Sequence, residues 1–172
     1  MLNLRQIDKK FCLSGGWTNI PEDAERLAAF GFKAVLDLQF NLYEEPNWFT
    51  SSVDFINVAC SEFDIDYRFV QMNDDVNPGI ASIYEKTYEI LDSWDRLYTG
   101  KKDKILVKCG AGVSRSPSVL CYYYCKRDGI SYIEARDRIR EVDAVNNVYL
   151  YGPPISINAF FEDFLKERFP DE

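Results

Sequence analysis

Histidine is absent from this chain of 172 residues. Without an imidazole the chain cannot build a Ser-His-Asp triad or a Cys-His pair, so any nucleophile must be activated in another way. Long apolar runs are also absent, because no window approaches the roughly 20 apolar residues of a membrane helix. The opening residues, MLNLRQIDKK, lack the apolar centre of a signal peptide. We therefore expect a cytoplasmic location and no membrane partner.

The cysteines do not have the spacing of a metal site. No CxxC pair occurs, and there is no histidine to complete a zinc site, so we expect no metal and no cofactor. The odd number favours reduced, buried thiols, which are Cys12, Cys60, Cys109, Cys121 and Cys125. Cys121 and Cys125 are spaced to share one face of a helix, which favours core packing and leaves a redox partnership with Cys109 as the minor alternative.

Basic residues are outnumbered, with 20 lysines and arginines against 28 acids and a net charge of −8. This balance argues against a nucleic-acid partner, which needs a basic face, so an anionic ligand requires a local site. Apolar residues make up 47% of the chain and no low-complexity tract occurs, which excludes a disordered or fibrous protein. We predict one globular domain over residues 1–172.

Strand and helix patterns alternate along the chain, which predicts an α/β fold with a central, mostly parallel sheet flanked by helices. Segments rich in β-branched and aromatic residues predict strands at 10–13, 33–40, 55–60, 67–72 and 105–107. Apolar residues at helical spacing, together with capping signals, predict helices at 21–30, 80–98, 115–127, from 131 onward and at 156–169. The cap signals include Asn19 or Thr18, Gly31, Gly129 and the capping box at 131–134.

One segment, VKCGAGVSRSPS at residues 107–118, is unsuited to core packing and well suited to holding an anion. Cys109 ends a predicted strand and Arg115 opens a helix; the small residues between them are Gly110, Ala111, Gly112, Val113 and Ser114. Such a loop turns backbone N–H groups inward beside the positive end of a helix dipole, and the arginine fork matches two oxygens of a phosphate. The same surroundings favour a cysteine thiolate, so we prefer a nucleophile over the alternative of a buried structural thiol.

The run from Cys109 to Ser116 resembles the CxxGxSRS active-site loop of cysteine-based protein phosphatases, specifically the dual-specificity branch. The opening segments and the order of later helices are also similar, so the resemblance covers nearly the whole chain and implies a protein tyrosine phosphatase-like fold. It implies that Cys109 attacks phosphorus to form a phosphocysteine, that residues 110–115 bind the phosphate, and that Ser116 steadies the leaving thiolate. No glutamine follows Cys109, which fits this branch better than the tyrosine-specific one.

The family takes its general acid from an aspartate on a loop some thirty residues before the cysteine. The segment YRFVQMNDDVN resembles that region, with Gln71 where a proline is common, and Asp74 falls on the acid position, 35 residues before Cys109. Asp75 stays open as the alternative acid, and turn or capping chemistry is the alternative for both aspartates. A second departure is Lys108, where the family usually has a histidine that accepts backbone hydrogen bonds. We expect retained but slower activity.

Basic groups are missing from the loop positions between Cys109 and Arg115, and residues 62–75 carry five acids against one base. This charge disfavours phosphoinositides and RNA ends, so we expect a phosphoprotein, carrying phosphotyrosine or also phosphoserine and phosphothreonine, or a small phosphomonoester as substrate. Two alternatives remain open. One is a non-catalytic phosphopeptide-binding module, if Lys108 or a misplaced Asp74 blocks the chemistry. The other, ranked lower, is a rhodanese or arsenate reductase type of cysteine enzyme.

Overall fold

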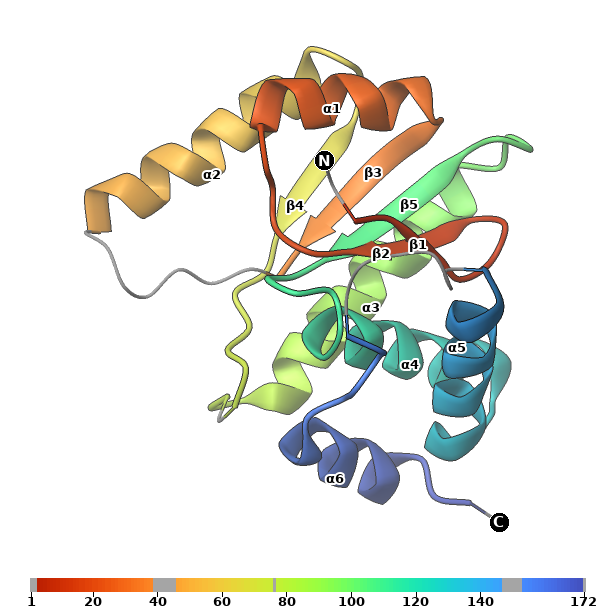
Figure 1. Ribbon diagram of the computed structural model, residues 1–172. Helices are drawn as coiled ribbons and strands as arrows, with labels where there is room; N and C mark the ends of the chain where they lie inside the picture. The colour runs from red at the N-terminus through yellow and green to blue at the C-terminus, as the bar shows by residue number, and fades with distance from the viewer. Residues whose placement is uncertain (1–2, 39–45, 76, 147–152, 172) are drawn as a thin grey trace.

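The computed structural model describes residues 3–38, 46–75, 77–146 and 153–171 (Figure 1). Within these residues the strands form one sheet in the order β1-β2-β5-β3-β4. The strands are β1 (Arg5–Gln6), β2 (Phe11–Ser14), β3 (Phe32–Asp37), β4 (Asp66–Phe69) and β5 (Lys104–Lys108). Among the strands of the described residues, only the pairing of β1 with β2 is antiparallel. The predicted α/β fold with a mostly parallel sheet is therefore confirmed.

Helices cover both faces of the sheet (Figure 1). On one face lie α1 (Ile20–Ala29) and α2 (Pro46–Ser61). On the other face lie α3 (Ile80–Leu97), α4 (Arg115–Asp128), α5 (Tyr132–Asn146) and α6 (Ala159–Arg168). No helix in the described part of the chain combines the length and the apolar character needed to cross a bilayer.

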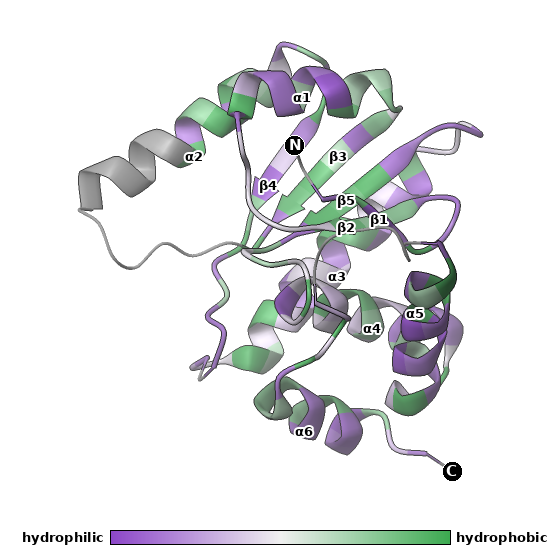
Figure 2. Ribbon diagram, viewed as in Figure 1, coloured by the Kyte–Doolittle hydropathy of each residue, from purple (hydrophilic) through white to green (hydrophobic). Residues whose placement is uncertain are grey.

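The sheet separates two hydrophobic cores. Along β5, Ile105 and Val107 belong to the larger core under α3 and α4, whereas Leu106 belongs to the smaller core under α1 and α2, because successive side chains of a strand point to opposite faces. Because helices cover both faces of the sheet, the central strands β3 and β5 are largely hydrophobic (Figure 2). Helix α4 is buried from Arg115 through Cys125, so the segment that follows the glycine loop runs through the centre of the molecule.

One strand prediction is wrong: residues 55–60 lie in α2. Their β-branched and aromatic content favoured a strand, but Ile56, Ala59 and Cys60 are buried while Phe55 and Val58 are exposed. That spacing places one helical face in the smaller core, and burial of this face outweighs the local strand preference.

The other predicted elements are present with shifted ends. The strand predicted at 67–72 is β4, which ends at Phe69. The strand predicted at 33–40 is β3, which ends at Asp37. Residues 39–40 of that prediction lie outside the described residues. Ser131 Oγ accepts the Glu134 N–H at 3.2 Å, one half of the predicted capping box. The N-cap of α1 is Asn19, but the side chain that accepts backbone N–H groups there is that of Asp23.

Candidate active site

The loop between β5 and α4 holds the Cys109 sulfur in a polar environment. Cys109 directly follows β5 and is only 2% exposed. The backbone N–H of Gly112 donates to Sγ at 3.2 Å, and Ser116 Oγ lies 3.4 Å from Sγ. Two hydrogen-bonding groups therefore contact the sulfur at the N-terminus of α4.

Close packing against the residues after β2 explains why this loop needs glycine. Gly112 has a φ of 73°, and a Cβ there would lie 2.7 Å from the Ser14 carbonyl carbon. Gly16 N–H donates to the Gly110 carbonyl at 2.7 Å, and Cys109 N–H donates to the Ser14 carbonyl at 3.2 Å. Gly110 and Ala111 are exposed, Gly112 is buried, and Val113 and Ser114 are half-buried. The SGG turn at 14–16 thus forms one wall of the loop.

Arg115 is anchored at one side of its guanidinium. Nη1 donates to the Met72 carbonyl at 3.1 Å and lies 3.4 Å from the Leu38 carbonyl, to which it also donates. A Cβ at Gly110 would lie 2.9 Å from Nη2, which shows that Nη2 lies close to Gly110. The edge formed by Nε and Nη2 therefore faces the loop, and this is the edge that can bind two oxygens of a phosphate.

Asp74, and not Asp75, has its carboxylate at this arginine. Asp74 Oδ1 lies 2.7 Å from Arg115 Nε, an ionic contact without the geometry of a hydrogen bond, and the Asp74 side chain is 67% exposed. The Asp75 carboxylate makes no ion pair among the described residues. Buried Asn77 shapes this turn, since Oδ1 accepts the Asn73 N–H at 2.8 Å and Nδ2 donates to the Asn73 and Asp75 carbonyls at 3.0 Å each.

Sequence reasoning missed Asn158, which joins three parts of the site. Asn158 Nδ2 donates to the Asp74 carbonyl at 2.8 Å, and its backbone N–H donates to Ser114 Oγ at 3.0 Å. Its Oδ1 accepts the Phe160 N–H and so caps α6. An asparagine before an apolar helical stripe signals a cap, but no local pattern could reveal its contact with a loop 84 positions away.

Lys108 lies under the loop and not inside it. Like Leu106 it points toward the smaller core, where its side chain is fully buried and Nζ donates to Asp37 Oδ1 at 2.9 Å. Asp37 Oδ2 also accepts the Trp17 Nε1–H at 2.9 Å and the Tyr67 hydroxyl at 3.1 Å. Burial and the neighbouring Asp37 raise the pKa of Tyr67 far above its ordinary value, which keeps it a donor.

The remaining cysteines, Cys12, Cys60, Cys121 and Cys125, are buried free thiols. Burial raises the pKa of Cys12, Cys60 and Cys125 to about 12, and that of Cys121 well above its ordinary value. These four thiols are therefore protonated at neutral pH, which agrees with core packing as their role.

A family model of the dual specificity phosphatase catalytic domain matches residues 17–148, a segment that includes Cys109, Arg115 and Asp74. The chain belongs to this family. Over 95 residues it is 38% identical to a probable dual specificity protein phosphatase of Dictyostelium discoideum. The matched segment covers 55% of this chain and 38% of that relative. Membership of the dual specificity phosphatases removes the support for a rhodanese or arsenate reductase.

Solved structures similar to this chain share its fold at low sequence identity. The Cydia pomonella PTP-2 phosphatase has a TM-score of 0.72 at 20% identity, covering 97% of this chain and 90% of that one. Human DUSP28 has a TM-score of 0.64 at 18% identity, with coverages of 96% and 91%. PTPMT1 in complex with PI(5)P has a TM-score of 0.69 at 16% identity, with coverages of 95% and 92%. The predicted protein tyrosine phosphatase-like fold is therefore confirmed.

Proposed function

We propose that this protein hydrolyses phosphomonoesters through a phosphocysteine intermediate on Cys109. The observation that supports this most is the placement of Sγ between the Gly112 N–H and Ser116 Oγ, at the start of the helix that Arg115 opens. In the first step the thiolate attacks phosphorus while Arg115 and the amides of residues 110–115 bind the three non-bridging oxygens. The S–P bond forms, the P–O bond breaks, and Asp74 gives its proton to the leaving oxygen.

In the second step the ionised Asp74 takes a proton from water, and the resulting hydroxide attacks phosphorus. The S–P bond breaks and inorganic phosphate leaves, while the Ser116 hydroxyl donates to the departing thiolate. Asp74 contacts the same Nε of Arg115 that phosphate binds. The two anions therefore compete, and phosphate on Arg115 releases Asp74, which takes up a proton from solvent before it approaches the leaving oxygen as the acid.

For the substrate we propose a phosphoprotein or a small phosphomonoester. The loop between Cys109 and Arg115 contains no lysine or arginine, and the acid loop adds Asp74 and Asp75. These charges disfavour an inositol ring with several phosphates, although the PTPMT1 relative in fold was solved with PI(5)P. The decisive experiment measures hydrolysis of an aryl phosphate from pH 4 to 8, with vanadate as competitor. Vanadate-sensitive turnover supports the proposal, whereas binding of vanadate without turnover indicates a non-catalytic phosphate-binding module.

Replacement of Asp74 by asparagine should slow hydrolysis by about 10²- to 10³-fold, because the leaving oxygen loses its proton donor. The loss should be larger for phenyl phosphate than for p-nitrophenyl phosphate, whose leaving group needs a proton less. The fall in kcat toward alkaline pH should disappear as well. Asp75→Asn is the matched control, with kcat within about threefold of the native chain. Equal losses in both variants would assign the effect to the turn and not to an acid.

Asn158 is proposed as a positioning residue that ties the acid loop to the phosphate loop. Asn158→Ala removes the bond to the Asp74 carbonyl, and we expect kcat to fall about tenfold with little change in KM. Asn158→Ser keeps an N-cap acceptor for α6 but does not reach Asp74, so it separates the two roles. If serine restores both kcat and the melting temperature, Asn158 only caps the helix.

A further inference from the structure

A cavity of about 430 Å³, which we name the lysine pocket, lies at the opposite end of the sheet from Cys109. Its lining includes Lys9, Phe30, Gly31, Lys101, Lys102 and Lys104. We propose that the lysine pocket binds an acidic peptide segment of a protein partner. This proposal does not depend on catalysis by Cys109.

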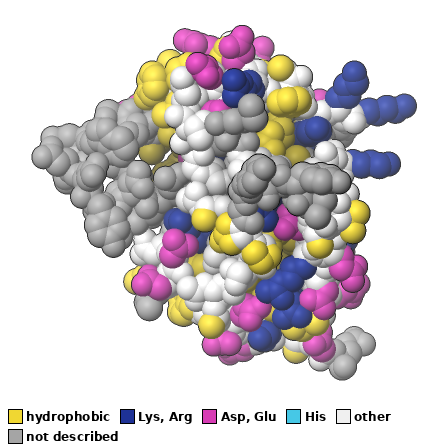
Figure 3. Space-filling view, viewed as in Figure 1, with side chains coloured by type: hydrophobic (Ala, Val, Ile, Leu, Met, Phe, Trp, Pro, Cys, Tyr) yellow, Lys and Arg dark blue, Asp and Glu magenta, His cyan; other side chains and the backbone are white. Residues whose placement is uncertain are grey.

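The lysine pocket is separate from the candidate active site. Lys104 begins β5 and Cys109 follows its end, five positions later. At about 3.3 Å per residue these two ends of the strand lie roughly 17 Å apart. Lys and Arg side chains project together on the side of the molecule where Figure 1 places the turns before β2 and β5 (Figure 3). A ligand confined to the lysine pocket therefore does not reach the sulfur.

Ordered backbone shapes the lysine pocket. Gly31 ends α1 with a φ of 86°, and a Cβ there would lie 2.5 Å from the Lys102 carbonyl oxygen. Lys104 N–H donates to the Gly31 carbonyl at 3.0 Å, and Ile105 N–H donates to the Lys10 carbonyl at 2.8 Å. Backbone hydrogen bonds thus hold together the three chain segments around Lys10, Gly31 and Lys104, and the lysine side chains extend from this ordered backbone.

The charges of these lysines are not neutralised within the described residues. Lys9, Lys101, Lys102 and Lys104 make no ion pair there. The carboxylate of Asp8 accepts two backbone N–H groups and the Tyr124 hydroxyl, and Asp103 Oδ2 accepts the Gly100 N–H. The C-terminus of α1 supplies only about half a negative charge. The hydrogen bonds to Asp8 and Asp103 do not cancel their charges, so the four lysines exceed these two carboxylates by two positive charges, and Lys104 Nζ also lies 5.8 Å over the Phe32 ring. In a chain with a net charge of −8, this local excess of positive charge favours an external anion.

A peptide fits the lysine pocket better than a membrane surface does. At physiological salt, charges act over about 8 Å, so a narrow acidic segment in the pocket is attracted mainly by the lysines, which outnumber the two neighbouring carboxylates. A broad anionic surface also meets the carboxylates around them, in a chain that is acidic as a whole. Phe30, 59% exposed, adds an apolar contact for a peptide side chain at the rim.

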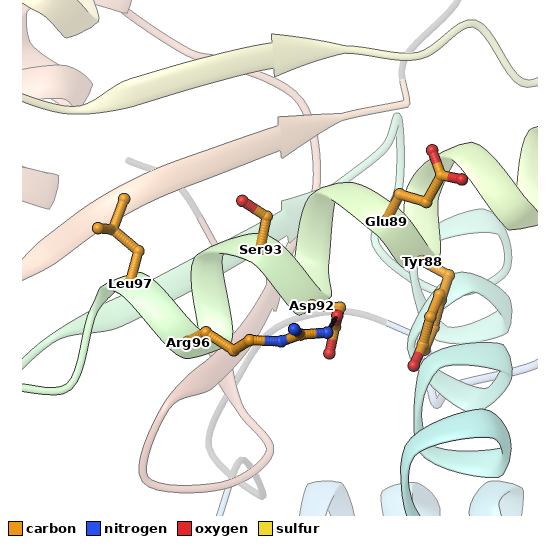
Figure 4. Close-up of a pocket in the computed structure, with 6 residues that line it drawn as sticks. All are labelled: Tyr88, Glu89, Asp92, Ser93, Arg96 and Leu97. Carbon is orange, nitrogen blue, oxygen red and sulfur yellow. Dashed lines mark hydrogen bonds and ion pairs between the residues drawn. The ribbon is translucent and has the colours of Figure 1, made fainter.

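A larger hollow on α3 lacks these properties. It has a volume of about 580 Å³ and lies on α3, and all six of its lining residues come from that one helix (Figure 4). Its Arg96 is paired with Asp92, so it offers no unneutralised positive charge. The charge and the ordered backbone of the lysine pocket distinguish it from this surface groove.

The test is the binding of a fluorescein-labelled, glutamate-rich decapeptide with a central leucine, followed by fluorescence anisotropy with the full chain. Lys101→Glu and Lys102→Glu should each weaken binding by about fivefold. Lys86→Glu is the matched control, because Lys86 is exposed, makes no ion pair among the described residues and changes the net charge equally. Vanadate should not displace the peptide.

Four results would overturn the proposal. Absence of saturable peptide binding removes the site, and equal weakening by Lys86→Glu reduces it to an effect of net charge. Displacement of the peptide by vanadate places the binding in the Cys109 loop. Binding to vesicles containing phosphatidylserine without binding to the peptide assigns the lysines to a membrane instead.

Discussion

Cys109→Ser should abolish aryl phosphate hydrolysis, with a loss in kcat of about 10⁴-fold or more. A serine hydroxyl stays protonated at neutral pH and becomes a nucleophile only when a base removes its proton. The chain has no histidine to do so. The Gly112 N–H and Ser116 Oγ, which stabilise a thiolate, cannot replace a base. Steady-state hydrolysis of p-nitrophenyl phosphate measures the loss.

Binding should survive this substitution, because Arg115 and the loop amides remain. Calorimetry with a phosphotyrosine peptide should therefore detect complex formation by Cys109→Ser without turnover. Cys125→Ser is the matched control, since Cys125 is a buried thiol whose pKa is raised to about 12 and which lies outside the loop. Its kcat should match that of the native chain. Turnover retained by Cys109→Ser would show that another residue is the nucleophile.

Local sequence was sufficient for the loop itself. Cys109, the glycines and Arg115 lie within seven residues, and strand, glycine loop and helix N-terminus follow directly from their order. The same holds for Gly31 and Gly129, whose φ values of 86° and 67° end helices as their positions predict. These features depend on backbone conformation, which a few neighbouring residues determine.

Partners distant in sequence could not be predicted. Asn158 bonds to Asp74, which is 84 positions away in the sequence, and Lys108 bonds to Asp37, which is 71 positions away. Strand order decides the second contact, since β3 and β5 are paired in the sheet although they are far apart in the chain. The error at residues 55–60 has the same origin, because the face that α2 buries depends on packing against β4 and α1. Tertiary contacts thus determined what periodicity and propensity left open.

The second large effect is expected on stability. Lys108→Met should lower the free energy of unfolding by about 3–5 kcal/mol, because it leaves the Asp37 carboxylate buried without its cation. Asp37 is 2% exposed and Lys108 is fully buried, so solvent cannot replace the lost charge. For a domain of this size the melting temperature should fall by roughly 6–20 °C. Thermal unfolding followed by circular dichroism measures it.

A double variant tests whether the charge itself causes the loss. In Lys108→Met with Asp37→Asn, no carboxylate remains at position 37, while the asparagine side-chain oxygen can still accept from Trp17 Nε1 and the Tyr67 hydroxyl, which bond to Asp37 Oδ2. We therefore expect the double variant to be more stable than Lys108→Met alone, as when a buried ion pair is replaced as a unit. Lys86→Met, on the exposed surface, should change stability by less than about 0.5 kcal/mol. If the Lys108→Met variant has the same melting temperature as the native chain, Asp37 does not need this cation.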